Sequence, residues 1–424
     1  MTEAEMYRKI LTQVEVLERI GVNYFDVEKE FFLIDSDNLP AIQTRFYGYS
    51  IQASGIYEAD NLTPEAAQNL DGRGCYVYVE VKDGQITIKQ DLNGCYGIYL
   101  FRHGNYFALS NSFFRLLDHV KFRYPLTINK DYVNQLLADG LCAIAYSETA
   151  VNEISLVERN AVLHIDIAQK KLEAEFINYE EYTVPLDTEK GMATLDRWVE
   201  FWGKIIRGVV QHTKFFTADL SGGFDSRVSL ALLLSSGVNP QKLYFRSHKD
   251  NLYNTNAEDY HIASQIAAHY GFKLKSKFPD VESLNYTLDD IFNINFYGKQ
   301  SFSNIPEFQT QKGIDKLYRL GGSNGETLRR HWQMTPKEFT EWFARKLCPY
   351  SRALSFKLFA SIEKILERGF RAVCNKYHIQ DTNSKDIPQY IHQEVRSRTH
   401  FGKGTLCLYF INNFILSPAL DPLV

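Results

Sequence analysis

The chain has 424 residues and a formal net charge of −4 at pH 7, and 45% of its residues are hydrophobic. This composition fits a globular protein of about two domains and excludes a strongly basic nucleic-acid-binding surface. The six cysteines form no Cys-x-x-Cys pair, which argues against a zinc site or a disulfide framework. The polar, acidic first residues are unlike a signal peptide, and no apolar run is long enough to span a membrane. We therefore expect a cytoplasmic protein with neither a nucleic-acid nor a membrane partner.

The first part of the chain reads mainly as antiparallel strands. Residues 75–81 and 85–89 are rich in β-branched and aromatic side chains and flank an Asp83-Gly84 turn, which is the signature of a hairpin. Residues 96–101 and 106–109 repeat this pattern around a second glycine-containing turn. Repeated hairpins of this kind predict an antiparallel β-sandwich.

The pattern changes after the polar, proline-containing segment 179–187, which we interpret as a linker. Strands then alternate with helices: strand 215–220, helix 225–236, strand 243–247, helix 257–270 and strand 316–320. This alternation predicts a doubly wound parallel sheet and an α/β class overall. The expected domains are residues 1–185 and residues 191–424. Ligands of such sheets bind at the carboxyl ends of the strands.

The most informative segment lies at one of those ends and reads Leu220-Ser221-Gly222-Gly223-Phe224-Asp225-Ser226. A strand, a glycine-rich turn and a helix in this order direct backbone N–H groups and a helix N-terminus to one point, which favours a phosphate group. Gly222 and Gly223 allow the backbone to approach the ligand without a Cβ atom in the way. The sequence therefore predicts a phosphate-binding loop.

Three side chains of this loop support that interpretation. The hydroxyls of Ser221 and Ser226 can donate hydrogen bonds to phosphate oxygens. The carboxylate of Asp225 would repel phosphate directly, so its place is best explained by a bound divalent cation, most plausibly Mg²⁺. The segment is not a Walker A loop, because Gly-x-x-x-x-Gly-Lys is absent. The alternative is a Ser/Gly turn that only connects a strand to a helix.

The pattern Ser-Gly-Gly-x-Asp-Ser after a strand resembles the pyrophosphate loop of the N-type ATP pyrophosphatases. Together with six further segments, it makes nearly the whole chain similar to the asparagine synthetase superfamily. Those segments are residues 70–72, 91–99, 107–112, 256–271, 398–402 and 417–422. The resemblance implies a class II glutamine amidotransferase-like sandwich over residues 1–185, followed by an ATP pyrophosphatase-type synthetase domain over residues 191–424.

The resemblance also implies an activity, namely an ATP-dependent, AMP-forming ligase that joins a carboxylate to an amine or to ammonia. ATP and Mg²⁺ are the implied cofactors, and a homodimer is one assembly that the family allows. The implied metal ligands are Asp225 and Glu326, and the implied catalytic residues are these two and Lys299. The implied nucleotide-binding residues are Leu220, Ser221, Gly222, Gly223, Asp225, Ser226, Phe245 and Gly321.

The sequence departs from the family pattern at three places. Thr2 stands where the family glutaminases have a nucleophilic cysteine, so we expect no glutaminase activity. After the third strand, Gly322 and Gly325 replace a glutamate and an aspartate of the family, and only Glu326 remains. The chain also ends before the stretch that carries a charge-stabilising lysine in the family, for which Lys299 and Lys403 are the candidates to substitute. These departures keep a second hypothesis open, a catalytically degenerate nucleotide-binding scaffold of the same fold.

Overall fold

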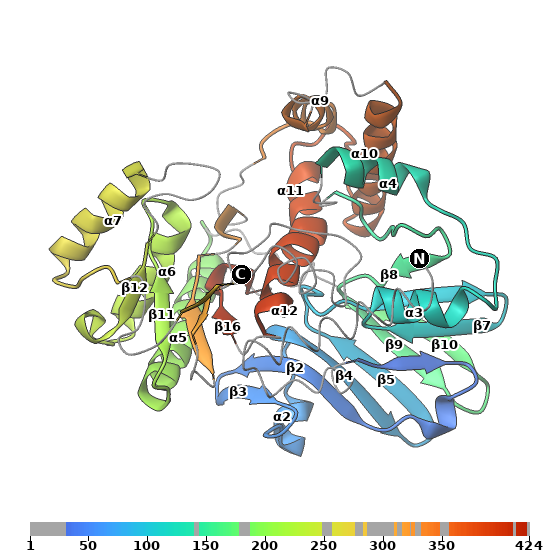
Figure 1. Ribbon diagram of the computed structural model, residues 1–424, viewed down its shortest axis with the longest axis horizontal. Coiled ribbons are helices and arrows are strands. Elements are labelled where there is room, and N and C mark those ends of the chain that lie inside the picture. Colours follow the sequence, from blue (N-terminus) through green and yellow to red (C-terminus); the bar gives the residue numbers. More distant parts are fainter. Residues whose placement is uncertain are drawn as a thin grey trace.

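The structure combines antiparallel sheets with a parallel sheet in a mixed α/β arrangement (Figure 1). This computed structural model describes residues 31–139, 144–177, 187–247, 257–275, 283–285, 309–311, 316–322, 324–326, 332–347, 356–409 and 413–421. Among the helices in those ranges, none is long and apolar enough to cross a membrane. The predicted α/β class with both kinds of sheet is confirmed.

The larger antiparallel sheet has the strand order β10-β9-β5-β4-β2-β3. Its strands are β2 (Arg45–Gln52), β3 (Gly55–Glu58), β4 (Gly74–Lys82), β5 (Gln85–Gln90), β9 (Ala161–Asp166) and β10 (Lys171–Phe176). β4 and β5 form the first predicted hairpin. Its turn residues Asp83 and Gly84 both have positive φ, at 51° and 76°, as the two-residue turn that suits the twist of a hairpin requires.

The smaller antiparallel sheet has the strand order β1-β7-β6-β8. Its strands are β1 (Leu33–Asp35), β6 (Tyr99–His103), β7 (Tyr106–Ser110) and β8 (Ile154–Leu156). β6 and β7 are the second predicted hairpin. Val77 and Ile88 of the larger sheet belong to the same buried cluster as Phe107 and Leu109 of the smaller one. The two sheets therefore share a core, as the layers of a sandwich do.

The parallel sheet has the strand order β12-β11-β15-β16. Its strands are β11 (Phe216–Asp219), β12 (Tyr244–Arg246), β15 (Leu317–Leu320) and β16 (Asn413–Leu416). The three predicted strands correspond to β11, β12 and β15, and they pair in parallel as expected. β16 was not predicted and pairs with β15. Because β11 and β15 are neighbours, the segments that follow them lie side by side at one edge of the sheet.

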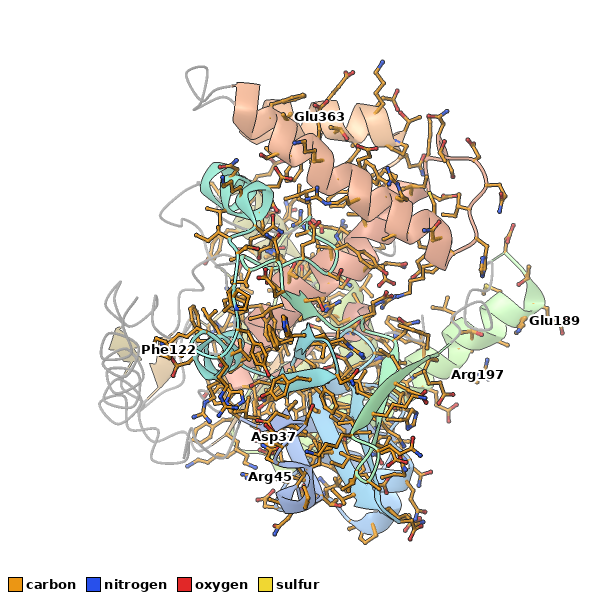
Figure 2. All side chains as sticks on the ribbon, turned by 90° about the vertical axis from the view of Figure 1, so that its right-hand side faces the viewer. Asp37, Arg45, Phe122, Glu189, Arg197 and Glu363 are labelled. Atoms are coloured by element: carbon orange, nitrogen blue, oxygen red, sulfur yellow. The ribbon has the colours of Figure 1, made fainter. Side chains whose placement is uncertain are left out.

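Three helices accompany this sheet, namely α5 (Glu189–His212), α6 (Phe224–Ser235) and α7 (Ala257–His269). The bounds of α6 and α7 agree with the prediction to within one residue. The sequence analysis missed α5, in which Trp198 and Trp202 are buried at helical spacing. Figure 2 shows Glu189 and Arg197 on its outer side, where both are exposed.

A further group of helices completes the structure, and part of it lies between the antiparallel and the parallel sheets (Figure 1). It consists of α4 (Lys130–Asp139), α9 (Pro336–Leu347), α10 (Phe356–Lys376), α11 (Ile387–Ile391), the π-helical stretch η7 (His392–Gly402) and α12 (Lys403–Tyr409). α4 packs against α10 although more than 200 residues separate them in the chain (Figure 1). The other short elements are η2 (Leu39–Ala41), α2 (Pro64–Gln68), α3 (Phe113–Val120), η4 (Pro240–Lys242), β13 (Ser283–Asn285), β14 (Gln309–Gln311) and η8 (Pro418–Leu420).

The predicted boundary between residues 185 and 191 lies partly outside the described residues. The two larger antiparallel sheets use residues 33–176, the parallel sheet uses residues 216–416, and β13 and β14 form a separate two-stranded antiparallel sheet. The two parts are bonded to each other at several points. Tyr49 of β2, for example, donates its hydroxyl to the carbonyl of Ile415 in β16 at 3.1 Å.

Candidate nucleotide site

The predicted phosphate loop connects β11 to α6 directly. Leu220, which directly follows the strand, is buried. Gly223 is the N-cap residue of α6, and no side chain makes a capping hydrogen bond there. The first backbone N–H groups of α6 therefore start at the loop, as an anion site at a helix N-terminus requires. The predicted order of strand, glycine-rich turn and helix is present.

The two serine hydroxyls of the loop hold the turn together. Ser226 Oγ accepts from the backbone N–H of Ser221 at 3.0 Å and lies 3.2 Å from Ser221 Oγ. Ser221 Oγ in turn accepts from the backbone N–H of Gly223 at 3.1 Å. Ser226 is buried. The Ser226 hydroxyl therefore stabilises the conformation of the loop.

The loop after β15 packs tightly on the first turn of α6. A Cβ atom on Gly322 would lie 2.6 Å from both the carbonyl carbon of Asp225 and the backbone nitrogen of Ser226. The adjacent Gly321 accepts from Ser229 Oγ through its carbonyl at 2.9 Å. No side chain, and certainly no glutamate, fits at position 322 unless the backbone of one segment moves.

The second glycine of that loop packs against the carboxyl group of Asp225. A Cβ atom on Gly325 would lie 2.7 Å from Asp225 Cβ and closer still to the carboxyl atoms of that residue. An aspartate at position 325 would therefore compete with Asp225 for the same space. The close approach of this loop to α6 therefore explains why both positions are glycines.

Glu326, which directly follows Gly325, is held by a histidine from η7. Its Oε2 lies 2.8 Å from His392 Nε2. The histidine side chain is fully buried, whereas the glutamate side chain is 26% exposed. Asp225 and Glu326, the two predicted metal ligands, thus belong to two segments that are in contact.

His400 lies close enough to Glu326 and to several basic residues to interact with their charges. Burial, together with Arg396, His392 and Lys403, lowers the pKa of His400 to about 4, while Glu326 acts in the opposite direction. His400 is therefore neutral at pH 7. Lys403, one of the two lysines considered from the sequence, is almost completely buried at the start of α12. Lys299, the other, lies outside the described residues.

The predicted nucleotide contact of Phe245 does not fit the placement of its ring. Phe245 is completely buried and stacks on Phe272 with ring centroids 4.0 Å apart. The ring is thus part of the core beside β11. The aromatic side chain exposed at the loop is Phe224, at 43%, which the sequence analysis placed in the motif without giving it a role.

The sequence analysis also missed Asp259 of α7. A Cβ atom on Gly222 would lie 2.6 Å from Asp259 Oδ1 and 2.8 Å from Ile262 Cδ1. The first turn of α7 therefore approaches the phosphate loop from the side opposite to β15.

The donor set can be compared with what Mg²⁺ needs. Within the described ranges, no group of three or more His, Cys, Asp or Glu side chains could hold a metal ion by itself. Mg²⁺ in nucleotide sites takes one or two carboxylates and completes its shell with phosphate oxygens and water. Asp225 and Glu326 therefore fit a magnesium ion that arrives with a nucleotide and do not form a separate metal site.

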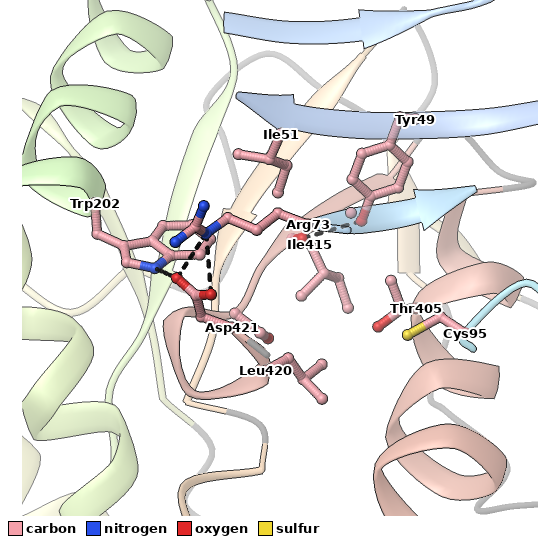
Figure 3. Close-up of a pocket in the computed structure, with 11 residues that line it drawn as sticks. Tyr49, Ile51, Arg73, Cys95, Trp202, Thr405, Ile415, Leu420 and Asp421 are labelled. Carbon is pink, nitrogen blue, oxygen red and sulfur yellow. Dashed lines mark hydrogen bonds and ion pairs between the residues drawn. The ribbon is translucent and has the colours of Figure 1, made fainter. Parts of the chain in front are cut away.

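Two buried contacts join the site to the sandwich. Asp421 accepts from Arg73 Nε at 2.9 and 3.0 Å and from Trp202 Nε1 at 2.9 Å (Figure 3). These residues line a cavity of about 20 Å³, which is room for about one water molecule. Asn93 donates to the carbonyl of Leu420, immediately before Asp421.

The second contact is a buried ionic network centred on Glu394 of η7. Its carboxylate accepts from Arg159 Nε at 2.9 Å, from Lys376 Nζ at 2.9 Å and from the hydroxyl of Tyr377 at 2.5 Å. Burial alone would raise the pKa of Glu394, but Arg159 and Lys376 bring it down to about 2. Glu394 is therefore ionised, and it ties η7 to the segment between β8 and β9.

Comparison with known proteins adds little to this geometry. No protein-family model matches the chain, and no curated protein matches it. Among solved structures, a glutamine phosphoribosylpyrophosphate amidotransferase from B. subtilis, complexed with ADP and GMP, is similar at 8% identity with a TM-score of 0.16. The match covers 69% of this chain and 49% of that chain, so this chain spans about half the length of that protein. A likeness at this TM-score does not establish a shared fold.

Proposed function

We propose that the protein is an ATP-dependent, AMP-forming ligase that adenylates a carboxylate and transfers the acyl group to an amine or to ammonia, without glutaminase activity. The observation that carries this proposal is the contact between the phosphate loop and the segment of Gly325 and Glu326. The Ser221–Ser226 turn and the segment that carries Glu326 meet at the carboxyl edge of a parallel sheet, which is where such sheets bind nucleotides.

The residues of the loop would act mainly by positioning. Backbone N–H groups of the first turn of α6 would bind the triphosphate at the N-terminus of this helix. Asp225 and Glu326 would hold Mg²⁺, which neutralises phosphate charge when it is bound. Fixed donors around the phosphates stabilise the charge that builds up during nucleotidyl transfer.

The reaction would proceed in two displacements. The substrate carboxylate attacks the α-phosphorus of ATP, which releases pyrophosphate and leaves an acyl-adenylate. The amine then attacks the acyl carbon, the bond to AMP breaks, and the amine gives up a proton. The same proposal includes the domain organisation and the location. The first domain would be an amidotransferase-like sandwich without glutaminase activity, and the second would be a synthetase-type domain. The protein would be cytoplasmic.

Pyrophosphate exchange tests the proposal. The protein is incubated with Mg²⁺, ATP, labelled pyrophosphate and pools of candidate carboxylates. Label is expected in ATP only when the pool contains the substrate carboxylate. Asp225→Ala should abolish this exchange, whereas Asp166→Asn on the distant strand β9 should not change it. Exchange at the wild-type rate in the Asp225 variant would reject the assignment.

The replacement of two family carboxylates by Gly322 and Gly325 favours one alternative, a nucleotide-binding scaffold. That alternative predicts binding of Mg·ATP in calorimetry together with no exchange for any carboxylate. The ligase proposal predicts both binding and carboxylate-dependent exchange.

A further inference from the structure

The π-helical stretch η7 contacts the Asn324–Glu326 segment at two points. His392 Nε2 lies 2.8 Å from Glu326 Oε2, and Ser397 Oγ donates to Asn324 Oδ1 at 3.1 Å. His392 and Ser397 are both buried. Asn324 has a positive φ of 70°, and its Nδ2 donates to the carbonyl of Ala419 at 3.2 Å. The segment is therefore held by η7 side chains on one side and by the backbone carbonyl of Ala419 on another.

The imidazole of His392 is itself held in a fixed orientation. It packs edge-on against the ring of Trp332, with centroids 4.9 Å apart and an interplanar angle of 67°. Phe401 lies on a further side at 6.2 Å. Since aromatic neighbours fix the ring plane, Nε2 points at Glu326 in a defined direction. A carboxylate bonded in this way loses much of its rotational freedom.

η7 is also anchored on the side that faces the sandwich. Glu394 is bonded to Arg159, as described above, and Arg398 donates through Nη2 to the carbonyl of Val157. Arg398 is 2% exposed. The backbone that carries His392 is thus fixed to the sandwich side of the molecule, and the contact with Glu326 rests on a rigid support.

We infer that His392 is a positioning residue, which holds the carboxylate of Glu326 beside Asp225 in the orientation that receives the magnesium–nucleotide complex. This inference rests on the proposed function. His392 is 0% exposed and cannot touch a substrate, so it acts only through Glu326. Partners that orient metal-binding carboxylates in this way typically affect metal affinity by roughly 10–100-fold.

Two amide substitutions of different length distinguish a positioning role of His392 from a packing role. The amide nitrogen of His392→Gln can reach the place of Nε2, whereas that of the shorter His392→Asn cannot. We expect His392→Asn to weaken Mg·ATP binding about tenfold in calorimetry and His392→Gln to stay within about threefold of wild type. Binding of ATP in the presence of a chelator should be equal in all three proteins, because Glu326 then has no ion to hold.

A double substitution provides the second readout. If His392 acts through Glu326, then Glu326→Gln combined with His392→Asn should bind Mg·ATP no more weakly than Glu326→Gln alone. The matched control is His119→Asn, which removes a similar pair, His119 Nε2 with Asp35 Oδ2 at 2.8 Å, from the sandwich. This control should bind Mg·ATP like wild type.

The outcomes separate the inference from the proposed function. A wild-type protein that fails to bind Mg·ATP overturns the proposed function and the inference together. Wild-type binding that is unchanged in His392→Asn overturns the inference alone. Equal losses in the glutamine and asparagine variants, with and without Mg²⁺, assign His392 to packing and also overturn the inference.

Discussion

Gly325 lies against the carboxyl group of Asp225 so closely that the position has no room for a Cβ atom. The Asp225 side chain can therefore occupy its present position only when residue 325 is a glycine. An aspartate at position 325 and the present position of the Asp225 side chain exclude each other.

Gly325→Ala should therefore reduce both stability and nucleotide binding. Forcing a methyl group into this contact should cost about 1–3 kcal/mol, measured by urea unfolding, and should weaken Mg·ATP binding because Asp225 must move. Gly208→Ala in α5 is the control, since nothing lies within 4 Å of its new methyl group and alanine favours a helix. Equal stability of the two variants would contradict the close contact.

The two glycines of the phosphate loop should respond differently to alanine. A methyl group on Gly222 would collide with Asp259 and Ile262 of α7, whereas one on Gly223 would meet only Ser221 Oγ at 3.2 Å. We expect Gly222→Ala to lower the unfolding midpoint and Gly223→Ala to leave it nearly unchanged. Unfolding in denaturant measures this, and adding Asp259→Ala should recover part of the loss in Gly222→Ala. An equal midpoint for the two single variants would contradict the approach of α7 to the loop.

Asp421→Asn should strongly destabilise the protein. The carboxylate of Asp421 is fully buried and bonded to Arg73 and Trp202, so its loss leaves a guanidinium of low exposure with the more exposed Asp71 as its remaining carboxylate partner. Breaking a buried pair in this way typically costs about 3–5 kcal/mol, which urea unfolding resolves. Asp71→Asn removes the second, more exposed partner of Arg73 and should cost much less. A similar effect of both substitutions would show that Arg73 does not depend on Asp421.

Glu394 should make stability depend on pH in acid. Its pKa is about 2 in the folded protein against an ordinary value of 4.5. The folded state therefore binds this proton less readily than the unfolded state, so the contribution is full above pH 4.5 and is lost as pH falls toward about 2. The size is about 3 kcal/mol.

Glu394→Gln isolates this effect. The difference in unfolding free energy between wild type and this variant should shrink steadily from pH 5 to pH 2. His400 acts over a higher window, because its pKa is lowered from 6.5 to about 4 and stability falls as pH drops through that range in both proteins. A difference that stays constant with pH would show that Glu394 is not held ionised by Arg159 and Lys376.

Local signals explain what the sequence could predict. The Asp83-Gly84 turn determines its hairpin within a few residues, and the motif around Gly222 carries its own strand, turn and helix. Non-local contacts explain the rest. β16 becomes a strand only through its pairing with β15, and His392 meets Glu326 across 66 residues of chain. From the sequence alone, Gly322 and Gly325 look like the loss of two carboxylates, because no local pattern reveals that α6 packs against these positions.

The two sides of η7 also set limits on its length. Glu394 and Arg398 bond to the sandwich side, while His392 and Ser397 bond to the Asn324–Glu326 segment. Inserting or deleting one residue would rotate the following side chains by roughly a quarter turn relative to the preceding ones. Contacts made before the change would then be out of register with those made after it. Point substitutions can be absorbed singly, whereas changes in length between residues 392 and 398 cannot.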